Sequence, residues 1–288
     1  MNEMKKVPFS SRAFPADVTP VDGSIITSDQ TQIIAPAKDL SDLESRQDRG
    51  GVVKRVGSVA TPHFDESRTR EDFRVVKRHI LSRIDGEHGD KDKDPRTILV
   101  TSASPQEGKT TVVLGLAMSF IFERDYSVIL IDADMRSPEL SRRMGLAGEL
   151  GLLDYLENDE IGIEDIVYPT SVKGVYAVPS GLPRITAPEL IASERMTQLL
   201  RTFHDGSAKR IVIIDSGSVL ACSETVSLAG YAGQLLFVAA KGQTRRKDID
   251  EGLGILHRQA GPIDESRVAM VFNKTDQSRS PVRYSRNS

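Results

Sequence analysis

The chain has 288 residues, a formal net charge of −3 at pH 7 and a hydrophobic fraction of 39%. This length allows one large domain with tails, and the near-neutral charge argues against nucleic acid as a main partner, because phosphate backbones attract evidently basic surfaces. The one cysteine, Cys222, excludes an intrachain disulfide and suits a reducing cytoplasm. The longest apolar stretch, 112–122, is too short to span a bilayer, and the N-terminus predicts no signal peptide.

Residues 1–66 are rich in Pro, Ser, Thr, Asp and Gly and have no sustained periodicity, which predicts a disordered leader. A helix is predicted next, because apolar residues recur on one face at helical spacing: Phe73, Val76, Ile80 and Ile84. A charged loop that contains a glycine and a proline separates this helix from the first predicted strand.

After this loop, apolar runs alternate with helical patterns. Continuous Val, Ile and Leu strands separated by helices predict an α/β fold for residues 67–275, with a mostly parallel central sheet and helices on both faces. A capping box from Thr186 to Glu189 supports one helix start, and residues 276–288 form a polar tail. The predicted strands are 97–102, 127–132, 174–179, 210–215, 234–239 and 267–272, and the predicted helices are 109–123, 138–145, 151–158, 187–204, 223–231 and 245–260.

The most informative segment is the loop 103–110, Ala-Ser-Pro-Gln-Glu-Gly-Lys-Thr, which joins an apolar strand to a helix. This context predicts a phosphate-binding loop, in which backbone N–H groups and the positive end of the helix stabilise phosphate oxygens. Lys109 is expected to reach the β- and γ-phosphates, and the Thr110 hydroxyl to ligate Mg²⁺. The predicted nucleotide-binding residues of this segment are Ser104, Pro105, Gln106, Glu107, Gly108, Lys109, Thr110 and Thr111.

Gln106 departs from the usual pattern of such loops. It occupies a position where a glycine often eases a positive φ. A residue other than glycine there costs about 1–3 kcal/mol if φ is positive. The sequence therefore predicts local backbone strain at this position.

Carboxylates follow two of the predicted strands. Asp132 and Asp134 stand two residues apart at the end of the second strand, and Asp215 ends the fourth. Ligands of open α/β sheets bind at this carboxyl edge. Beside a phosphate loop, carboxylates hold Mg²⁺ or accept a proton from an attacking hydroxyl. We therefore expect Lys109, Asp132 and Asp134 to be catalytic, and Thr110, Asp132 and Asp215 to support the metal.

The last predicted strand is followed by Asn273, whose side chain is suited to hydrogen-bond a nucleobase edge. The run from Asn273 to Asp276 also fits NKxD, a motif that guanine-binding GTPases use. A GTPase is therefore one alternative from the residues alone.

Together these motifs resemble the bacterial protein-tyrosine autokinases of capsular and exopolysaccharide biosynthesis, which are P-loop NTPases of the cell-division-ATPase-like class. The DxDxR from Asp132 to Arg136 and the apolar strand that ends at Asp215 are similar to the family's motifs. The segment 71–77 is similar to its ExxRxxR oligomerisation helix, with lysine for the last arginine, and 188–193 is similar to its PxELLxS segment. The match is most similar to the soluble, exosortase-associated subgroup.

The resemblance implies an ATP- and Mg²⁺-dependent tyrosine autokinase that regulates exopolysaccharide assembly through a membrane copolymerase, or chain-length, protein. It implies a homo-oligomer in the cytoplasm, held at the inner face of the membrane by that partner. Arg136 and Asn273 would contact the nucleotide. Glu71, Arg74 and Lys77 would contact a neighbouring protomer.

Two departures from the family's pattern bear on activity. The segment 216–218, Ser-Gly-Ser, follows Asp215 where the family has prolines, so we expect a looser strand end. The family also ends in a tyrosine cluster that receives phosphate, whereas Tyr284 is the single tyrosine of this tail and the expected acceptor.

Because the tail has a single tyrosine, a second class of protein remains an alternative: an ATP-bound switch, or an ATPase, without kinase activity. A positioning ATPase of the cell-division kind is disfavoured, because Ser104 stands at the place of its signature lysine.

Overall fold

The computed structural model describes residues 20–21, 68–86, 93–123, 125–205, 209–261 and 267–275. The predicted tail, with Tyr284, lies outside the described residues, as does the predicted leader except for its short strand β1 (Pro20–Val21). Among the described residues, no helix is long and apolar enough to cross a bilayer.

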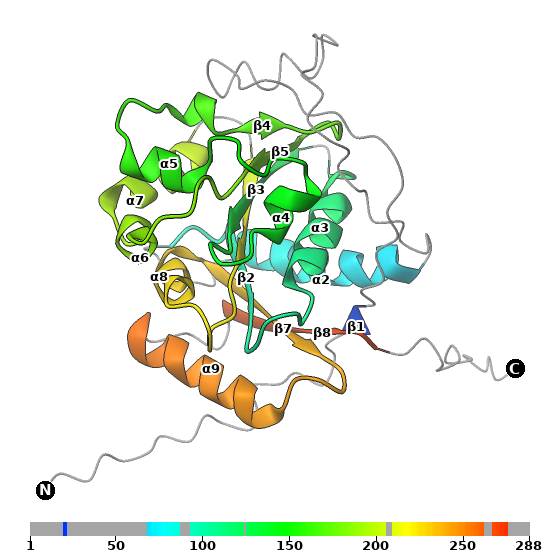
Figure 1. Ribbon diagram of the computed structural model, residues 1–288. Coiled ribbons are helices and arrows are strands. Elements are labelled where there is room, and N and C mark those ends of the chain that lie inside the picture. The colour runs from blue at the N-terminus through cyan, green and yellow to red at the C-terminus, as the bar shows by residue number, and fades with distance from the viewer. Residues whose placement is uncertain are drawn as a thin grey trace, which may run out of the picture.

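One eight-stranded sheet runs through the molecule in the order β1-β8-β7-β2-β6-β3-β5-β4 (Figure 1). All neighbouring strands are parallel except β4 and β5, which are antiparallel. The predicted parallel sheet is therefore confirmed, with β1 and the antiparallel β4 as additions. Beyond β1, the strands are β2 (Thr97–Ser102), β3 (Tyr126–Ala133), β4 (Tyr168–Pro169), β5 (Val175–Val178), β6 (Lys209–Ser216), β7 (Gln234–Ala240) and β8 (Val268–Asn273).

Helices cover both faces of this sheet (Figure 1). On one face, Phe73, Leu116 and Leu140 belong to a core that joins α2, α3 and α4 to the strands. On the other face, residues such as Leu199 and Leu253 join α5 to α9 in a second core. The helices are α2 (Arg68–Ile84), α3 (Lys109–Phe120), α4 (Glu139–Arg143), α5 (Leu152–Glu157), α6 (Ala187–Ile191), α7 (Glu194–His204), α8 (Glu224–Tyr231) and α9 (Arg246–Gln259), with a 3₁₀ turn η1 (Ile163–Asp165).

The predicted helix 187–204 is two helices, because Ser193 adopts an extended backbone (φ −80°, ψ 159°) between α6 and α7. The predicted capping box is wrong as well. Thr186 has φ −83° and ψ 12° and makes no side-chain cap, so α6 begins with Pro188 in its first turn instead. Proline is tolerated there because the N–H that it lacks has no partner inside a helix.

The parallel arrangement brings three chemically important segments to one edge of the sheet. The phosphate loop follows β2, Asp132 lies near the end of β3, and Asp215 lies near the end of β6. Strands β3 and β6 are neighbours, and their register pairs Asp132 directly with Asp215. The fold thus places both carboxylates beside the phosphate loop.

Gly115 holds α3 against α2, which gives a test of this packing. A Cβ built on Gly115 would lie 2.0 Å from Cζ of Phe73, a ring that is only 2% exposed. Gly115→Ala should therefore destabilise the protein by about 1–3 kcal/mol in urea unfolding, despite the better helix propensity of alanine. The matched control is Gly230→Ala in α8, where nothing lies within 4 Å of the added Cβ. Equal stabilities of the two variants would contradict the packing described.

Candidate nucleotide-binding site

The loop 103–108 turns sharply between β2 and α3. Gln106 has φ 63° and Gly108 has φ 97°, both in the left-handed region. The predicted strain at Gln106 is therefore confirmed. A side chain at Gly108 is excluded for two reasons. The positive φ disfavours it, and a Cβ would lie 1.8 Å from Nδ2 of Asn273.

A buried glutamate fastens this loop from within. Glu107 is fully buried, and its carboxylate accepts a hydrogen bond from the backbone N–H of Ser104 (2.8 Å) and another from the Thr244 hydroxyl. The amide of Ser104 and the side chain of Glu107 therefore hold the loop's shape. Both groups are thus engaged by hydrogen bonds within the protein.

The end of β8 braces the same loop from the side. Asn273 donates from Nδ2 to the backbone oxygen of Glu107 (3.0 Å), and its Oδ1 accepts from the backbone N–H of Lys274 (2.8 Å). Lys274 donates from Nζ to the backbone oxygen of strained Gln106 (2.8 Å) and to Oε1 of Gln243 (2.9 Å). The Asn273 amide thus supports the phosphate loop in this structure, rather than presenting its polar atoms to a base.

Gln243 and Thr244 were missed by sequence reasoning. They lie in the turn after β7, and Gln243 donates from Nε2 to the backbone oxygen of Pro105 (3.3 Å). Their distance of more than 130 residues from the loop leaves no local signal. The Asp276 of the NKxD string lies outside the described residues.

Asp132 is fully buried and well bonded. Its Oδ2 accepts hydrogen bonds from the backbone N–H and the hydroxyl of Ser141, both at 2.7 Å, and its Oδ1 accepts from the backbone N–H of Asp134 at 3.2 Å. Burial raises the pKa of Asp132, while the Ser141 hydrogen bonds oppose that rise. This carboxylate anchors α4 to the end of β3.

Asp215 is buried beside it and lacks such partners. Neither carboxylate oxygen of Asp215 has a hydrogen bond of ordinary geometry, although the side chain is 1% exposed. Burial raises the pKa of Asp215, and the neighbouring Asp132 raises it further. The nearby Thr110 hydroxyl and Lys109 ammonium oppose that rise. Buried polar groups are almost always paired, so two orphaned oxygens call for a ligand.

These residues fit a Mg²⁺ ion. Carboxylate and hydroxyl oxygens are the donors this ion prefers, and it is usually held by one or two carboxylates together with substrate phosphates. The described residues form no cluster of three or more His, Cys, Asp or Glu that would hold a metal alone. Asp215, Thr110 and Asp132 would hold such an ion together with phosphate oxygens.

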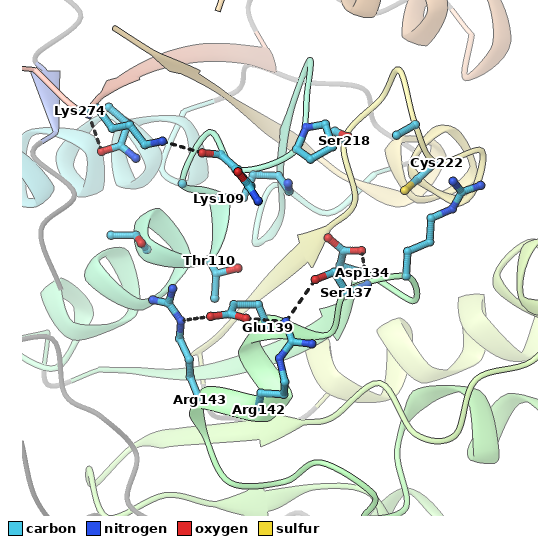
Figure 2. Close-up of a pocket in the computed structure, with 17 residues that line it drawn as sticks. Lys109, Thr110, Asp134, Ser137, Glu139, Arg142, Arg143, Ser218, Cys222 and Lys274 are labelled. Carbon is cyan, nitrogen blue, oxygen red and sulfur yellow. Dashed lines mark hydrogen bonds and ion pairs between the residues drawn. The ribbon is translucent and has the colours of Figure 1, made fainter. Parts of the chain in front are cut away.

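A cavity of about 730 Å³ opens above these groups. Figure 2 shows Lys109, Thr110 and Asp134 around it. The candidate site residues that line it are Pro105, Gln106, Gly108, Lys109, Thr110, Thr111, Asp134, Arg136 and Asn273. The wall opposite the loop was not predicted, and it consists of Ser137 and the α4 residues Glu139, Arg142 and Arg143.

The strand end after Asp215 is firmly held, so the expected looseness is wrong. The Ser216 hydroxyl donates to the backbone oxygen of Val100 (3.0 Å). The hydroxyls of Thr101 and Thr225 both donate to the backbone oxygen of Gly217, at 2.8 and 3.0 Å. Hydrogen bonds thus restrain the segment that prolines would otherwise stiffen.

The predicted oligomerisation residues of α2 differ in their surroundings. Arg74 is exposed, and the side chain of Glu71 lies outside the described part of the chain. Lys77 is 6% exposed and donates to the backbone oxygen of Ser119 (3.1 Å) and to Oε1 of Glu123 (2.5 Å). The expectation for Lys77 is therefore corrected, because its ammonium is used to dock α2 on α3 within the same chain.

The orphaned carboxylate of Asp215 gives a stability test. Its folded-state pKa is raised, so the wild-type protein should lose stability as pH rises from about 4 upward. At pH 8, without Mg²⁺ or nucleotide, the free energy of unfolding in urea should be higher for Asp215→Asn than for the wild type. The difference should be on the order of 1–3 kcal/mol, the usual cost of an unsatisfied buried group. The difference in unfolding free energy between Asp215→Asn and the wild type should become smaller towards pH 5. Asp205→Asn, at an exposed carboxylate, is the control, and matching pH profiles for all three proteins would refute the burial argument.

No protein-family model matches the chain. It is 34% identical over 186 residues to the putative tyrosine-protein kinase EpsB of Ralstonia nicotianae, covering 65% of this chain and 24% of that protein. It is 27% identical over 202 residues to the tyrosine-protein kinase YwqD of Bacillus subtilis, covering 70% of this chain and 80% of that protein. The match therefore spans about a quarter of EpsB but most of YwqD.

Solved structures agree with the fold. The kinase domain of the Escherichia coli tyrosine kinase ETK superposes with a TM-score of 0.64 at 22% identity, covering 86% of this chain and 92% of that one. The VpsO kinase domain gives a TM-score of 0.59 at 26% identity, covering 74% of this chain and all of that one. The homologues of this chain are thus bacterial tyrosine-protein kinases, as the sequence motifs predicted.

Proposed function

We propose that the chain is an ATP- and Mg²⁺-dependent protein-tyrosine autokinase that regulates exopolysaccharide biosynthesis. The observation that carries this proposal is the orphaned carboxylate of Asp215, buried beside Thr110 and Lys109 at the mouth of a phosphate loop. An uncompensated buried anion is costly unless a cation joins it, and a Mg²⁺–phosphate pair is what the neighbouring groups would hold. The kinase homologues support the same chemistry.

The residues divide the work of phosphoryl transfer. The backbone from Gly108 to Thr110 and the Lys109 ammonium bind and orient the phosphates at the positive end of α3. Bound Mg²⁺ would neutralise developing phosphate charge. The tyrosine oxygen forms a bond to the γ-phosphorus as the bridge to the β-phosphate breaks, so ADP leaves with that electron pair. Asp134 lines the cavity and accepts the tyrosine proton.

The proposed setting follows the resemblance. A membrane copolymerase would hold the chain at the inner face of the membrane, and copies of the chain would assemble with one another through Glu71 and Arg74. The exposure of Arg74 supports such a contact. The names of relatives such as EpsB and the putative tyrosine-protein kinase in the cps region of Klebsiella pneumoniae support the link to polysaccharide synthesis.

A second function is an ATP-bound switch without transfer. It is favoured by the tail, where Tyr284 is the single tyrosine after Tyr231. Incubation of the purified chain with labelled ATP and Mg²⁺, followed by phosphosite mapping, decides between the two. Label on a tyrosine supports the kinase, whereas ATP binding without label supports the switch.

Nucleotide binding should depend on Lys109. Loss of one charge-assisted contact with phosphate costs about 1.5–3 kcal/mol. Lys109→Ala should therefore weaken Mg·ATP binding roughly tenfold or more in calorimetry. Lys247→Ala, an exposed lysine on α9, is the matched control and should bind like the wild type. Wild-type affinity in Lys109→Ala would remove the phosphate loop from the account.

Asp134 should matter for transfer more than for binding. Asp134→Asn keeps the size of the side chain but removes the proton acceptor. Transfer or hydrolysis should then fall on the order of 10²–10⁴-fold, while ATP affinity changes much less. Asp250→Asn, at an exposed residue of α9, controls for the change of charge. Equal losses in rate and affinity would assign Asp134 a metal-holding or structural role instead.

A further inference from the structure

Beyond the phosphate loop, the cavity is lined by α4, and that side is rich in arginine. Arg142 and Arg143 both pair with the single carboxylate of Glu139, from Nη2 at 2.6 Å and from Nε at 2.7 Å. Figure 2 shows Glu139 held between these two arginines below Thr110. One carboxylate cannot neutralise two guanidinium groups, so this wall keeps a positive surplus.

Two further observations show that this surplus is available to a ligand. Nη1 of Arg143 is buried and has no hydrogen-bond partner among the described residues, which leaves a donor waiting for an acceptor. Arg136 lines the same cavity, is exposed, and forms no ion pair with any residue in the described ranges. Half of the Arg142 side chain is also exposed (51%), so solvent reaches it from the cavity mouth.

The residues expected to contact the nucleotide include Arg136 but neither Arg142 nor Arg143. In the proposed function, Lys109 and Thr110 would hold the phosphates and Asp134 would accept the proton of the acceptor. Arg142 and Arg143 lie on the side of the cavity away from Lys109 (Figure 2), so an acceptor would approach from that side, and Arg136 lines the same cavity. Guanidinium groups bind carboxylates in paired hydrogen bonds, which favours acidic residues next to the acceptor.

The geometry points to an acceptor subsite for a tyrosine flanked by acidic residues, supplied by another polypeptide. This inference rests on the kinase activity of the proposed function and places the acceptor tyrosine on another polypeptide in place of Tyr284. The chain's own Tyr284 has the opposite surroundings, because Arg279, Arg283 and Arg286 flank it and residues 278–288 contain no acidic residue. Like charges would disfavour this tail at the arginine-rich wall.

Peptide binding tests the subsite without requiring catalysis. Two peptides are compared on the full chain with Mg²⁺ and a non-hydrolysable ATP analogue: one with four glutamates around a phenylalanine, and a copy of residues 278–288 with phenylalanine for tyrosine. The acidic peptide should bind at least tenfold more tightly in fluorescence anisotropy. Equal binding, or tighter binding of the tail copy, would overturn the inference.

Arg142 supplies the decisive variants, since its side chain is half exposed and the fold does not rest on it. Arg142→Gln should weaken the acidic peptide about fivefold to tenfold, and Arg142→Glu should shift the preference towards the basic peptide. Affinity for the ATP analogue should not change in either. Arg201→Gln, an exposed arginine of α7 that lines a different cavity, should change nothing. A loss of nucleotide affinity as large as the loss of peptide affinity would assign Arg142 to the nucleotide and overturn the subsite.

Transfer to the tyrosine forms of both peptides separates this inference from the proposed function. Selective binding of the acidic peptide without transfer leaves the subsite intact and refutes the kinase. Transfer at equal kcat/KM to both peptides supports the kinase and refutes the acidic preference.

Discussion

The site depends on two buried carboxylates, Asp132 and Asp215, which the sheet register places side by side on adjacent parallel strands. Burial raises the pKa of both carboxylates, and Asp132 further raises that of Asp215. The protein satisfies them unequally: Asp132 receives the hydrogen bonds of Ser141, while Asp215 receives none of ordinary geometry. The unsatisfied carboxylate lies near Thr110 and Lys109 of the phosphate loop, and a cation there would relieve it.

The phosphate loop also contains a strained residue that its neighbours hold in place. Gln106 is held at positive φ where glycine would be unstrained, and such a residue persists only when its neighbours fix it. Glu107, Asn273 and Lys274 provide that restraint through buried or bridging hydrogen bonds. The loop is therefore shaped before a nucleotide arrives, which lowers the entropy lost on binding. The residues that shape it come from β8 and from the turn after β7.

Sequence patterns predicted the strands, the phosphate loop and the carboxylates, because each has a local signature. These signatures are continuous apolar runs, Gly-Lys-Thr at a helix start, and aspartates at strand ends, respectively. They failed where the cause is tertiary. The Glu139–Arg142–Arg143 cluster faces the loop only because Asp132 anchors α4, and Lys77 is buried only because α2 packs on α3. Gln243 and Thr244 reach the loop from more than 130 residues away. The break between α6 and α7 arises from the extended backbone of Ser193, which helix propensity does not predict.

Asp215 is expected to bind a cation together with phosphate rather than the cation alone. Thermal unfolding of the wild-type chain, measured with Mg²⁺ alone, with a non-hydrolysable ATP analogue alone and with both, tests it most directly. Ligands that bind the folded state raise Tm by mass action, by roughly 2–4 °C per kcal/mol for a chain of this size. The account predicts that the combination raises Tm by clearly more than the two separate shifts added together. Full stabilisation by Mg²⁺ alone, or by the analogue without Mg²⁺, would contradict it.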